Sequence, residues 1–336
     1  MWAYVVRRLA LGVLVLVGVA TITFFIARVI PSDPAARWVG PRATAEQISA
    51  ARVELGLDKP LVVQYIRYMG SLFRGDLGVS IRTHQPVASD LRAYVPASLE
   101  LVAASTILAL LVGLPLGIVA ALRKDMWPDH ACRFFAVGAV SLPTFWLGMT
   151  LQLVFFRGLG LLPLGGRLST ATRLMYPVQS ITGSLFIDAL ISGNWAALGN
   201  GLLHLILPAI TLAAYPVGLV ARMTRSSMLE VLNEDYIRAA RAYGLPERMV
   251  VYSYALRNAL GPTITVLALS AGYSLVNTFL IEAIFNWPGL GTYTALSVIT
   301  NDYTAVMGVT LFAAVVYVLL NLFADLLLAL DPRVRY

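Results

Sequence analysis

The chain has 336 residues, of which 58% are hydrophobic and only 13% are charged. That balance excludes an ordinary soluble globule and indicates an integral membrane protein. The formal net charge of +7 would suggest nucleic-acid binding in a soluble protein, but the arginines gather beside apolar stretches, where they orient membrane helices instead. We therefore expect a lipid environment and no nucleic-acid partner.

Several kinds of chemistry are excluded by the residue types that the chain has. A single cysteine, Cys132, cannot form an internal disulfide or a thiolate-rich metal site, and the three histidines stand far apart in the sequence. A phosphate-binding P-loop needs Gly-Lys, whereas the two lysines, Lys59 and Lys124, follow Asp58 and Arg123. We expect no catalytic residue, no metal and no cofactor in this chain, so energy from ATP has to come from a partner.

Six charge-free stretches predict an all-α integral membrane protein with six transmembrane helices. None shows the alternating pattern of a membrane β-strand, and an open backbone in lipid would leave polar groups unsatisfied. The first stretch, within residues 1–30, is too long for the ~7–15 apolar residues of a signal peptide and is read as a retained span. The six predicted spans are Leu9–Ala27, Leu101–Leu122, Phe134–Phe156, Leu205–Ala221, Asn258–Ile281 and Tyr303–Ala324.

The positions of the basic residues predict the orientation of these spans. Arginines and lysines gather before the first span, after the second, across residues 222–262 and at the C-terminus, where Arg333 and Arg335 lie, whereas the loop from Glu282 to Asp302 has none. Loops rich in arginine and lysine stay in the cytoplasm. Both termini are therefore expected to be cytoplasmic, although the three arginines of the 157–203 loop are a mild violation of this pattern.

The long first loop, residues 31–96, predicts a small external helical segment. Thr44 and Gln47 have the spacing of a capping box, and Gly56 is placed to end the helix that they begin. Asp58-Lys59-Pro60 then opens a second helix. Four apolar residues of that helix lie near one face: Val62, Ile66, Met69 and Phe73.

A charged segment between two apolar ones, Ser226 to Pro262, has the features of a docking element. Asn233 is placed to cap a helix beginning at Glu234, where acidic residues favour the positive end of the helix dipole, and Gly244 is placed to end it. Arg238 and Arg241 lie off the face that small residues leave open for close approach. That predicted docking surface comprises Glu234, Asp235, Tyr236, Ala239, Ala240, Tyr243 and Gly244.

Two further helix starts are predicted around this one. Ser227 and Glu230 have capping-box spacing for another short helix, and Pro246 suits the first turn of the helix that leads to the fifth span. The physical pattern alone leaves open an amphipathic helix lying on the lipid headgroups.

This charged segment resembles part of a known protein family. RAARAYGL, Arg238 to Leu245, and ALRNALGP, Ala255 to Pro262, resemble the cytoplasmic EAA loop with which permeases of ABC importers dock their ATPase. Two positions depart from the general motif, because Arg238 stands at its glutamate and Leu256-Arg257 replaces its usual Leu-Pro. Both departures are similar to the peptide-importer branch.

The resemblance covers nearly the whole chain. The external run from Glu54 to Val87, SLPTFWLG at Ser141, FNWPGLG at Phe285 and the terminal LDPRVRY are similar to peptide-importer permeases, and the 157–203 loop is more similar to dipeptide permeases than to oligopeptide ones. The resemblance implies the type I importer fold, with residues 97–336 as its core, in a bacterial inner membrane. It also implies a second permease subunit, two ATPase subunits that bind the ATP, and an extracytoplasmic solute-binding protein.

The implied mechanism is alternating access, in which ATP binding closes the ATPases and the docking helices pass that movement to the spans. Dipeptides are the expected solute, and nickel complexes, glutathione or haem remain alternatives that this branch also transports. Four small polar residues of the fifth span are candidates for the translocation path, although helix packing explains such residues equally well. They are Ser270, Ser274, Asn277 and Thr278.

Two rival classes also fit an apolar chain. An ion-coupled secondary transporter usually places ionisable residues inside the bilayer, whereas the first five predicted spans have none and Asp325 lies near the inner end of the sixth. A structural membrane scaffold is the other rival. If an ATPase copurifies with this chain and binds it through the docking segment, the importer is distinguished from both rival classes.

Overall fold

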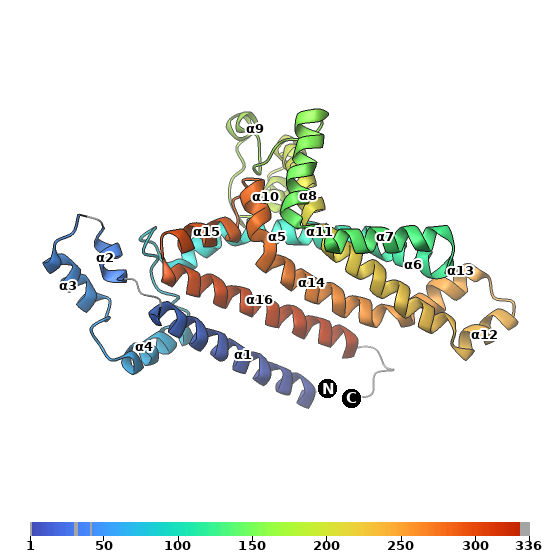
Figure 1. Cartoon of the computed structure of the whole chain (residues 1–336), viewed down its shortest axis with the longest axis horizontal. Helices are drawn as coiled ribbons and strands as arrows, with labels where there is room; N and C mark the ends of the chain where they lie inside the picture. The colour runs from blue at the N-terminus through green and yellow to red at the C-terminus, as the bar shows by residue number, and fades with distance from the viewer. Residues whose placement is uncertain (1, 30–32, 41, 330–336) are drawn as a thin grey trace. The chain divides into compact units, whose positions relative to one another are not determined.

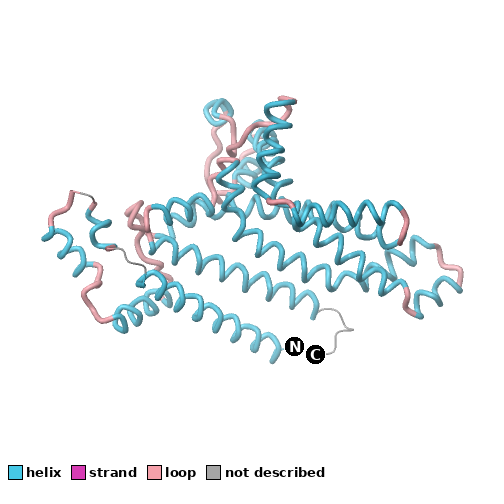
Figure 2. The backbone as a smooth tube through the Cα atoms, in the orientation of Figure 1, coloured by secondary structure: helices cyan, strands magenta, loops and turns pink. Residues whose placement is uncertain are grey.

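The computed structural model describes residues 2–29, 33–40 and 42–329. Most of these residues are helical, as Figure 2 shows, and one isolated bridge pairs Val79 with Pro86. The C-terminal LDPRVRY motif, with Arg333 and Arg335, lies outside the described residues, as does Pro31 at the start of the first loop.

The helices follow one another along the chain as labelled in Figure 1. The first half contains α1 (Trp2–Val29), α2 (Pro34–Val39), α3 (Ala45–Glu54), α4 (Leu61–Phe73), α5 (Val87–Leu108), α6 (Leu114–Leu122), α7 (Trp127–Ser141) and α8 (Thr144–Leu151). The second half contains α9 (Thr170–Met175), α10 (Leu185–Ile191), α11 (Trp195–Leu232), α12 (Asp235–Ala242), α13 (Glu247–Met249), α14 (Leu256–Ile284), α15 (Leu290–Ile299) and α16 (Tyr303–Ala329). Three π-helical turns interrupt or extend them: η1 (Ala109–Gly113), η2 (Gln152–Gly158) and η3 (Val250–Ala255).

Five helical stretches among the described residues are long and apolar enough to cross a membrane. Five of the six predicted spans are thereby confirmed. The helices run past the predicted ends, most clearly where the fourth span continues into the segment predicted as a docking loop. The five stretches are Val6–Arg28, Val87–Leu122, Trp195–Leu232, Glu247–Ile284 and Tyr303–Leu326.

The third predicted span, Phe134–Phe156, is not one straight helix. It is divided into α7 and the α8–η2 helix, whose axes differ by 103°. The break falls at Leu142 and Pro143, which have extended ψ angles of 131° and 124°. A proline pushes the residue before it out of the helical region and removes a backbone donor, so the SLP sequence ends α7 and begins α8. The chain has a sixth crossing only if this bent pair counts as one span.

The segment predicted to be external has the predicted helices. The Thr44–Gln47 capping box begins α3, Gly56 follows its end with a φ of 65°, and α4 begins after Pro60. The second span begins earlier than expected, because α5 starts at Val87 and includes Pro96. The last ten residues of the predicted 31–96 segment are therefore part of that helix.

The chain forms two compact units. The first contains residues 1–96 and 288–318, and two carboxylates hold its loops to its helices. Asp302 caps α16 by accepting from the Ala305 N–H at 3.0 Å and also accepts from the Ser80 hydroxyl at 2.5 Å. Asp90 of α5 accepts from the Tyr293 hydroxyl of α15 at 2.9 Å. A buried carboxylate such as Asp302, which is 0% exposed, is stable when such donors surround it.

The second unit, residues 97–287 and 319–336, is arranged around the 38-residue helix α11. This helix packs against α6, α7, α8 and α14. Glycines permit the closest approaches: a Cβ on Gly117 of α6 would lie 2.5 Å from the Thr224 Cβ, and one on Gly218 would lie 2.7 Å from the Ala136 carbonyl oxygen. Small residues at such contacts are typical of membrane helix pairs, which gain their stability from close packing.

The Gly117 contact predicts a specific sensitivity. In Gly117→Ala, the added methyl overlaps the Thr224 side chain and the Ala221 carbonyl oxygen, 2.6 Å away, so α6 and α11 have to separate. Overpacking of this kind costs about 1–3 kcal/mol. We expect a lower thermal unfolding midpoint in detergent. Gly138→Ala in α7 is the control, because a Cβ there meets nothing within 4 Å; equal midpoints for the two variants would contradict the packing argument.

Candidate functional site

The helix α12 ends as predicted at a glycine. Gly244 has a φ of 75°, the left-handed conformation that glycine adopts without a Cβ penalty. Its N–H donates to the Arg241 carbonyl at 2.9 Å, and the Leu245 N–H donates to the Ala240 carbonyl at 3.2 Å. These two bonds form a Schellman motif, which satisfies the last carbonyls of the helix and turns the chain toward α13.

The beginning of α12 differs from the prediction. Asn233 does not cap α12; it ends α11, and its side-chain amide donates to the Leu229 carbonyl at 2.8 Å. Glu234 occupies the N-cap position without a side-chain hydrogen bond, and Asp235 is the first helical residue. The short helix predicted from Ser227 is also wrong, because Ser227 is buried inside α11. Helix propagation over an apolar face outweighs the local capping signal there.

Two residues fix α12 to the rest of its unit. Ile237 is 0% exposed and Ala240 is 6% exposed, and both belong to a hydrophobic cluster with residues of α6, α11, η3 and α14. Leu245, just beyond the Schellman turn, packs against the same cluster. This corrects the predicted docking face: Ala240 lies against the chain's own core and is not available to a partner.

The part of α12 next to this buried pair is open. Tyr236, Ala239 and Tyr243 are exposed, and Tyr243 is 87% exposed. Of the predicted docking surface, Ala240 is therefore buried, whereas Tyr236, Ala239 and Tyr243 are exposed. The other buried residue, Ile237, was not part of the prediction. Asn258 of α14 donates to the Tyr236 hydroxyl at 2.6 Å, which fixes that ring without burying it.

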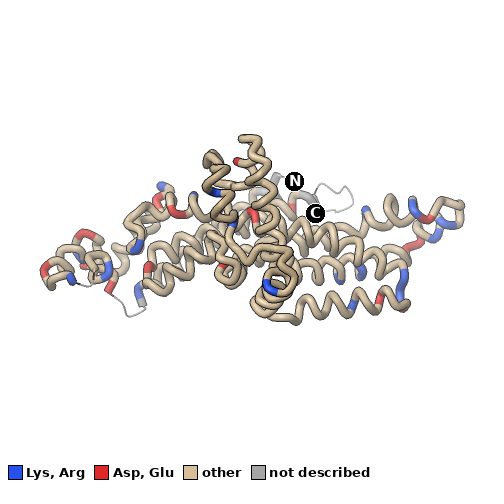
Figure 3. Tube along the Cα trace, turned by 90° about the horizontal axis from the view of Figure 1, so that it is seen from above, with Lys and Arg blue, Asp and Glu red and all other residues tan. Residues whose placement is uncertain are grey.

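Charged pairs border the open side. Arg238 pairs with Asp235 within α12, and Arg241 pairs with Glu247 of α13 at 2.7 Å. The hydrogen bond from Arg241 to Glu247 raises the pKa of the arginine, which is charged in any case, so the pair joins the two sides of the Gly244 turn. Figure 3 shows acidic and basic residues gathered at helix ends such as this one, with long uncharged stretches between them.

The predicted path residues of α14 do not share one open face. Ser270, Ser274 and Thr278 are buried, and the Ser270 and Thr278 hydroxyls donate to carbonyls of their own helix, those of Leu267 and Leu275. Asn277, at the edge of the same side of α14, is exposed. Helix packing explains the three buried residues, and a contact with solute stays a prediction for all four.

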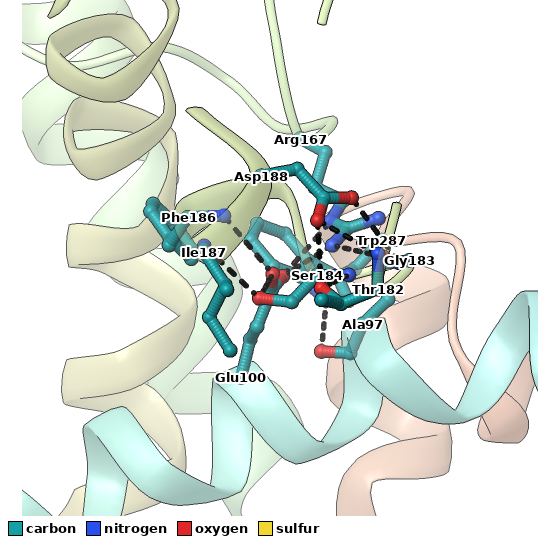
Figure 4. Close-up of polar contacts among 10 residues, drawn as sticks. All are labelled: Ala97, Glu100, Arg167, Thr182, Gly183, Ser184, Phe186, Ile187, Asp188 and Trp287. Carbon is teal, nitrogen blue, oxygen red and sulfur yellow. Dashed lines mark hydrogen bonds and ion pairs between the residues drawn. The ribbon is translucent and has the colours of Figure 1, made fainter. Parts of the chain in front are cut away.

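A polar cluster that the sequence reading missed lies at the base of the 157–203 loop (Figure 4). Glu100 of α5 accepts two hydrogen bonds from Arg167, at 2.9 and 2.6 Å, and one from the Ser184 hydroxyl at 2.7 Å. Arg167 also donates to the Gly183 carbonyl at 3.2 Å. Both arginine donors bind Oε2 of the carboxylate and Ser184 binds Oε1, at a largely buried position, which fixes the partners in orientation. The loop is thereby anchored to the second span.

The Asp188 carboxylate organises the loop itself. It accepts from the backbone N–H groups of Ile181, Thr182 and Gly183 and from the Thr182 hydroxyl, at 2.7 to 3.1 Å. Burial of Asp188 raises its pKa, but these four donors together outweigh burial and hold the pKa below its ordinary value. The loop therefore has a defined structure, organised around the buried Asp188 carboxylate.

Ionisable residues also occur within the helices that contain the predicted spans. Asp129 of α7 accepts from Arg225 of α11 at 2.6 and 2.7 Å, and Glu282 of α14 accepts from the Ser98 hydroxyl. Each lies just beyond a charge-free stretch, where sequence gives no sign of burial. Among the described residues, no cluster of three His, Cys, Asp or Glu side chains is placed to hold a metal ion.

The Gly244 turn yields a second prediction. Gly244→Val places a β-branched residue at a φ of 75°, which costs about 1–2 kcal/mol although the added Cβ meets no atom within 4 Å. We expect amide exchange in residues 235–245 to become roughly 5–30 times faster. Gly244→Asn should stay close to the wild type, because asparagine tolerates the left-handed region. An equal increase in amide exchange in Gly244→Val and Gly244→Asn would show that the left-handed conformation at residue 244 is not the cause.

The Asp188 cluster predicts a pH dependence. A folded-state pKa below the unfolded value of about 3.9 means that the stabilisation is present above that pH and is lost as pH falls through the folded pKa. Amide exchange of residues 181–191 should be faster in Asp188→Asn than in wild type at about pH 7. The two proteins should converge once the pH has fallen below the folded-state pKa of Asp188. Asp235→Asn, at an exposed ion pair, should leave this region unchanged, and a constant difference across the range would contradict the assignment.

Comparison with known proteins agrees with this architecture. Residues 1–102 match a model described as the N-terminal part of a binding-protein-dependent transport system membrane component, and residues 113–336 match the inner membrane component of such systems. A probable D,D-dipeptide transport system permease protein of Escherichia coli is 47% identical over 99% of this chain and 97% of its own length. A dipeptide transport system permease protein of Alkalihalophilus pseudofirmus is 41% identical over the whole of both chains.

A glutathione transport system permease protein of Salmonella paratyphi A is 36% identical over 99% of both chains. The similarity to these permeases extends from end to end, including residues 31–96, the 157–203 loop and α12. The predicted resemblance to permeases of ABC importers is confirmed: the chain belongs to the family of binding-protein-dependent transport system inner membrane components.

Proposed function

We propose that this chain is the membrane-spanning subunit of an ATP-driven importer for dipeptides. The proposal rests mainly on the observation that α12 is anchored to the core of its unit. Ile237 and Ala240 bind it to a cluster that includes residues of α6, α11 and η3, so a force on its open side passes to those helices. The end-to-end similarity to dipeptide permeases supports the solute class.

The open side of α12 is the proposed contact for an ATPase subunit. Glu234, Asp235, Tyr236, Ala239, Tyr243 and Gly244 are exposed there. The chain itself has no ATP-binding site in this proposal, so two ATPase subunits supply the hydrolysis and a second permease subunit, a different chain, completes the pathway. Both termini and α12 lie in the cytoplasm of a bacterial cell, because the arginine-rich segments are retained on that side.

Transport then proceeds by alternating access. A solute-binding protein delivers the dipeptide to the outer face, ATP binding draws the ATPases together, and α12 transmits the movement to the spans. The chain needs no cofactor of its own for this mechanical role. Glutathione, a tripeptide, is the second candidate solute because a glutathione permease is similar over nearly the full chain.

The test is uptake in cells from which this chain has been deleted and then restored. Labelled D,D-dipeptide, L,L-dipeptide and glutathione are compared, with wild type, Ala239→Glu, Ala240→Glu and Arg238→Ala. Wild type should restore dipeptide uptake. Ala239→Glu should abolish it at a normal membrane level, because an unpaired charge buried in the ATPase contact costs about 3 kcal/mol, roughly a hundredfold in affinity.

Ala240→Glu places its charge in the chain's own core, so its membrane level and thermal stability should fall. Arg238→Ala removes only an exposed ion pair and should transport normally. Full uptake by Ala239→Glu would refute the docking surface. Uptake that persists without the ATPase subunits would refute the importer, and restoration of glutathione uptake alone would select the second solute.

A further inference from the structure

The helix α4 has an apolar stripe that no other described residue of its unit covers. Val62, Ile66 and Phe73 are 68%, 64% and 78% exposed. Their spacings of 4 and 7 residues place them on one side of the helix. Arg67 is exposed as well, about 100° around the helix from Ile66. The helix is therefore amphipathic, with its apolar side outward.

The other side of α4 packs on the end of a membrane span. The Tyr65 hydroxyl lies 2.8 Å from the Thr21 hydroxyl of α1, and the Tyr68 ring stacks on the buried Phe24 at a centroid distance of 5.4 Å. The apolar stretch of α1 ends at Arg28, one turn beyond Phe24. These contacts place α4 at the depth where the hydrocarbon layer meets the headgroups, the level at which tyrosine is enriched.

The exposed surface of α1 continues onto α4. Phe25 is exposed on α1 and its ring stacks on Tyr65 at 6.0 Å, and Ile22 and Ile26 are exposed beside it. On a membrane span, exposed apolar side chains of this kind face lipid. Figure 1 shows α4 beside the C-terminal end of α1, with which it makes direct contacts. Lipid that contacts Phe25 of α1 is therefore also expected to contact α4.

We propose that α4 is an interfacial helix that lies in the membrane surface at the C-terminal end of α1, with Val62, Ile66 and Phe73 among the upper acyl chains. Arg67 faces the headgroups and water, which is the arrangement typical of helices that lie in the interface plane. The occupant of the apolar stripe is thus phospholipid. This rests on membership of a membrane family and on α1 as a span, and not on the solute or on the ATPase contact.

The test places a fluorophore at single positions of the full chain. In a Cys132→Ser background, Ile66→Cys, Phe73→Cys, Arg67→Cys and Ser49→Cys are labelled with an NBD probe and reconstituted into phospholipid nanodiscs. Nitroxide lipids carry the quencher at the headgroup or high on the acyl chain. Ser49 is exposed on α3 and serves as the aqueous reference.

We expect the acyl nitroxide to quench positions 66 and 73 at least about twofold more than positions 67 and 49, and aqueous iodide to show the reverse order. Val62→Cys replaces any labelled variant that fails to fold. Equal quenching by iodide at all four positions would overturn the proposal. So would protection at positions 66 and 73 that appears only when the second permease subunit or the binding protein is added, because the stripe would then be a protein contact.

Discussion

The burial of Ile237 and Ala240 is the contact on which the candidate site depends. An eight-residue helix is too short to be stable alone in water, and these two side chains hold α12 in a cluster that joins four other helical elements of its unit. The Schellman turn at Gly244 then directs Leu245 into the same cluster. The position of the exposed tyrosines follows from this packing, since the inner face sets the rotation of the helix.

Buried carboxylates have a comparable role in each unit. Asp302 collects donors from a loop and a helix start in the first unit, and Glu100 and Asp188 do so at the 157–203 loop in the second. Each of these carboxylates is largely buried, where an unpaired charge is costly. Because all donors have to be present at once, these clusters fix loops that would otherwise have many conformations.

The 157–203 loop and the helix α4 suit different surroundings. The 157–203 loop satisfies its polar groups internally and is tied to a span by the Arg167–Glu100 pair. The helix α4 keeps its polar contacts with α1 and leaves its apolar residues outside. The first arrangement suits a rigid body in water, and the second suits a boundary with an apolar solvent.

The sequence by itself determined the elements that depend on local chemistry. Charge-free stretches of sufficient length located five spans, Thr44 and Gln47 began α3, and Gly56 and Gly244 ended their helices, because each of these signals is read from the sequence nearby. The membrane class and the family followed from composition and from motifs.

Tertiary structure decided which side of each element is buried. Ala239 and Ala240 are identical side chains one residue apart, and only the cluster around Ile237 makes one a core residue and the other a surface residue. The same holds for Ser270 and Asn277 on α14, and for Ser227, whose capping signal is overridden inside α11. The Glu100–Arg167 pair joins residues 67 apart, which no local pattern encodes. Burial is set by neighbours that are distant in the chain, so only the folded arrangement assigns it.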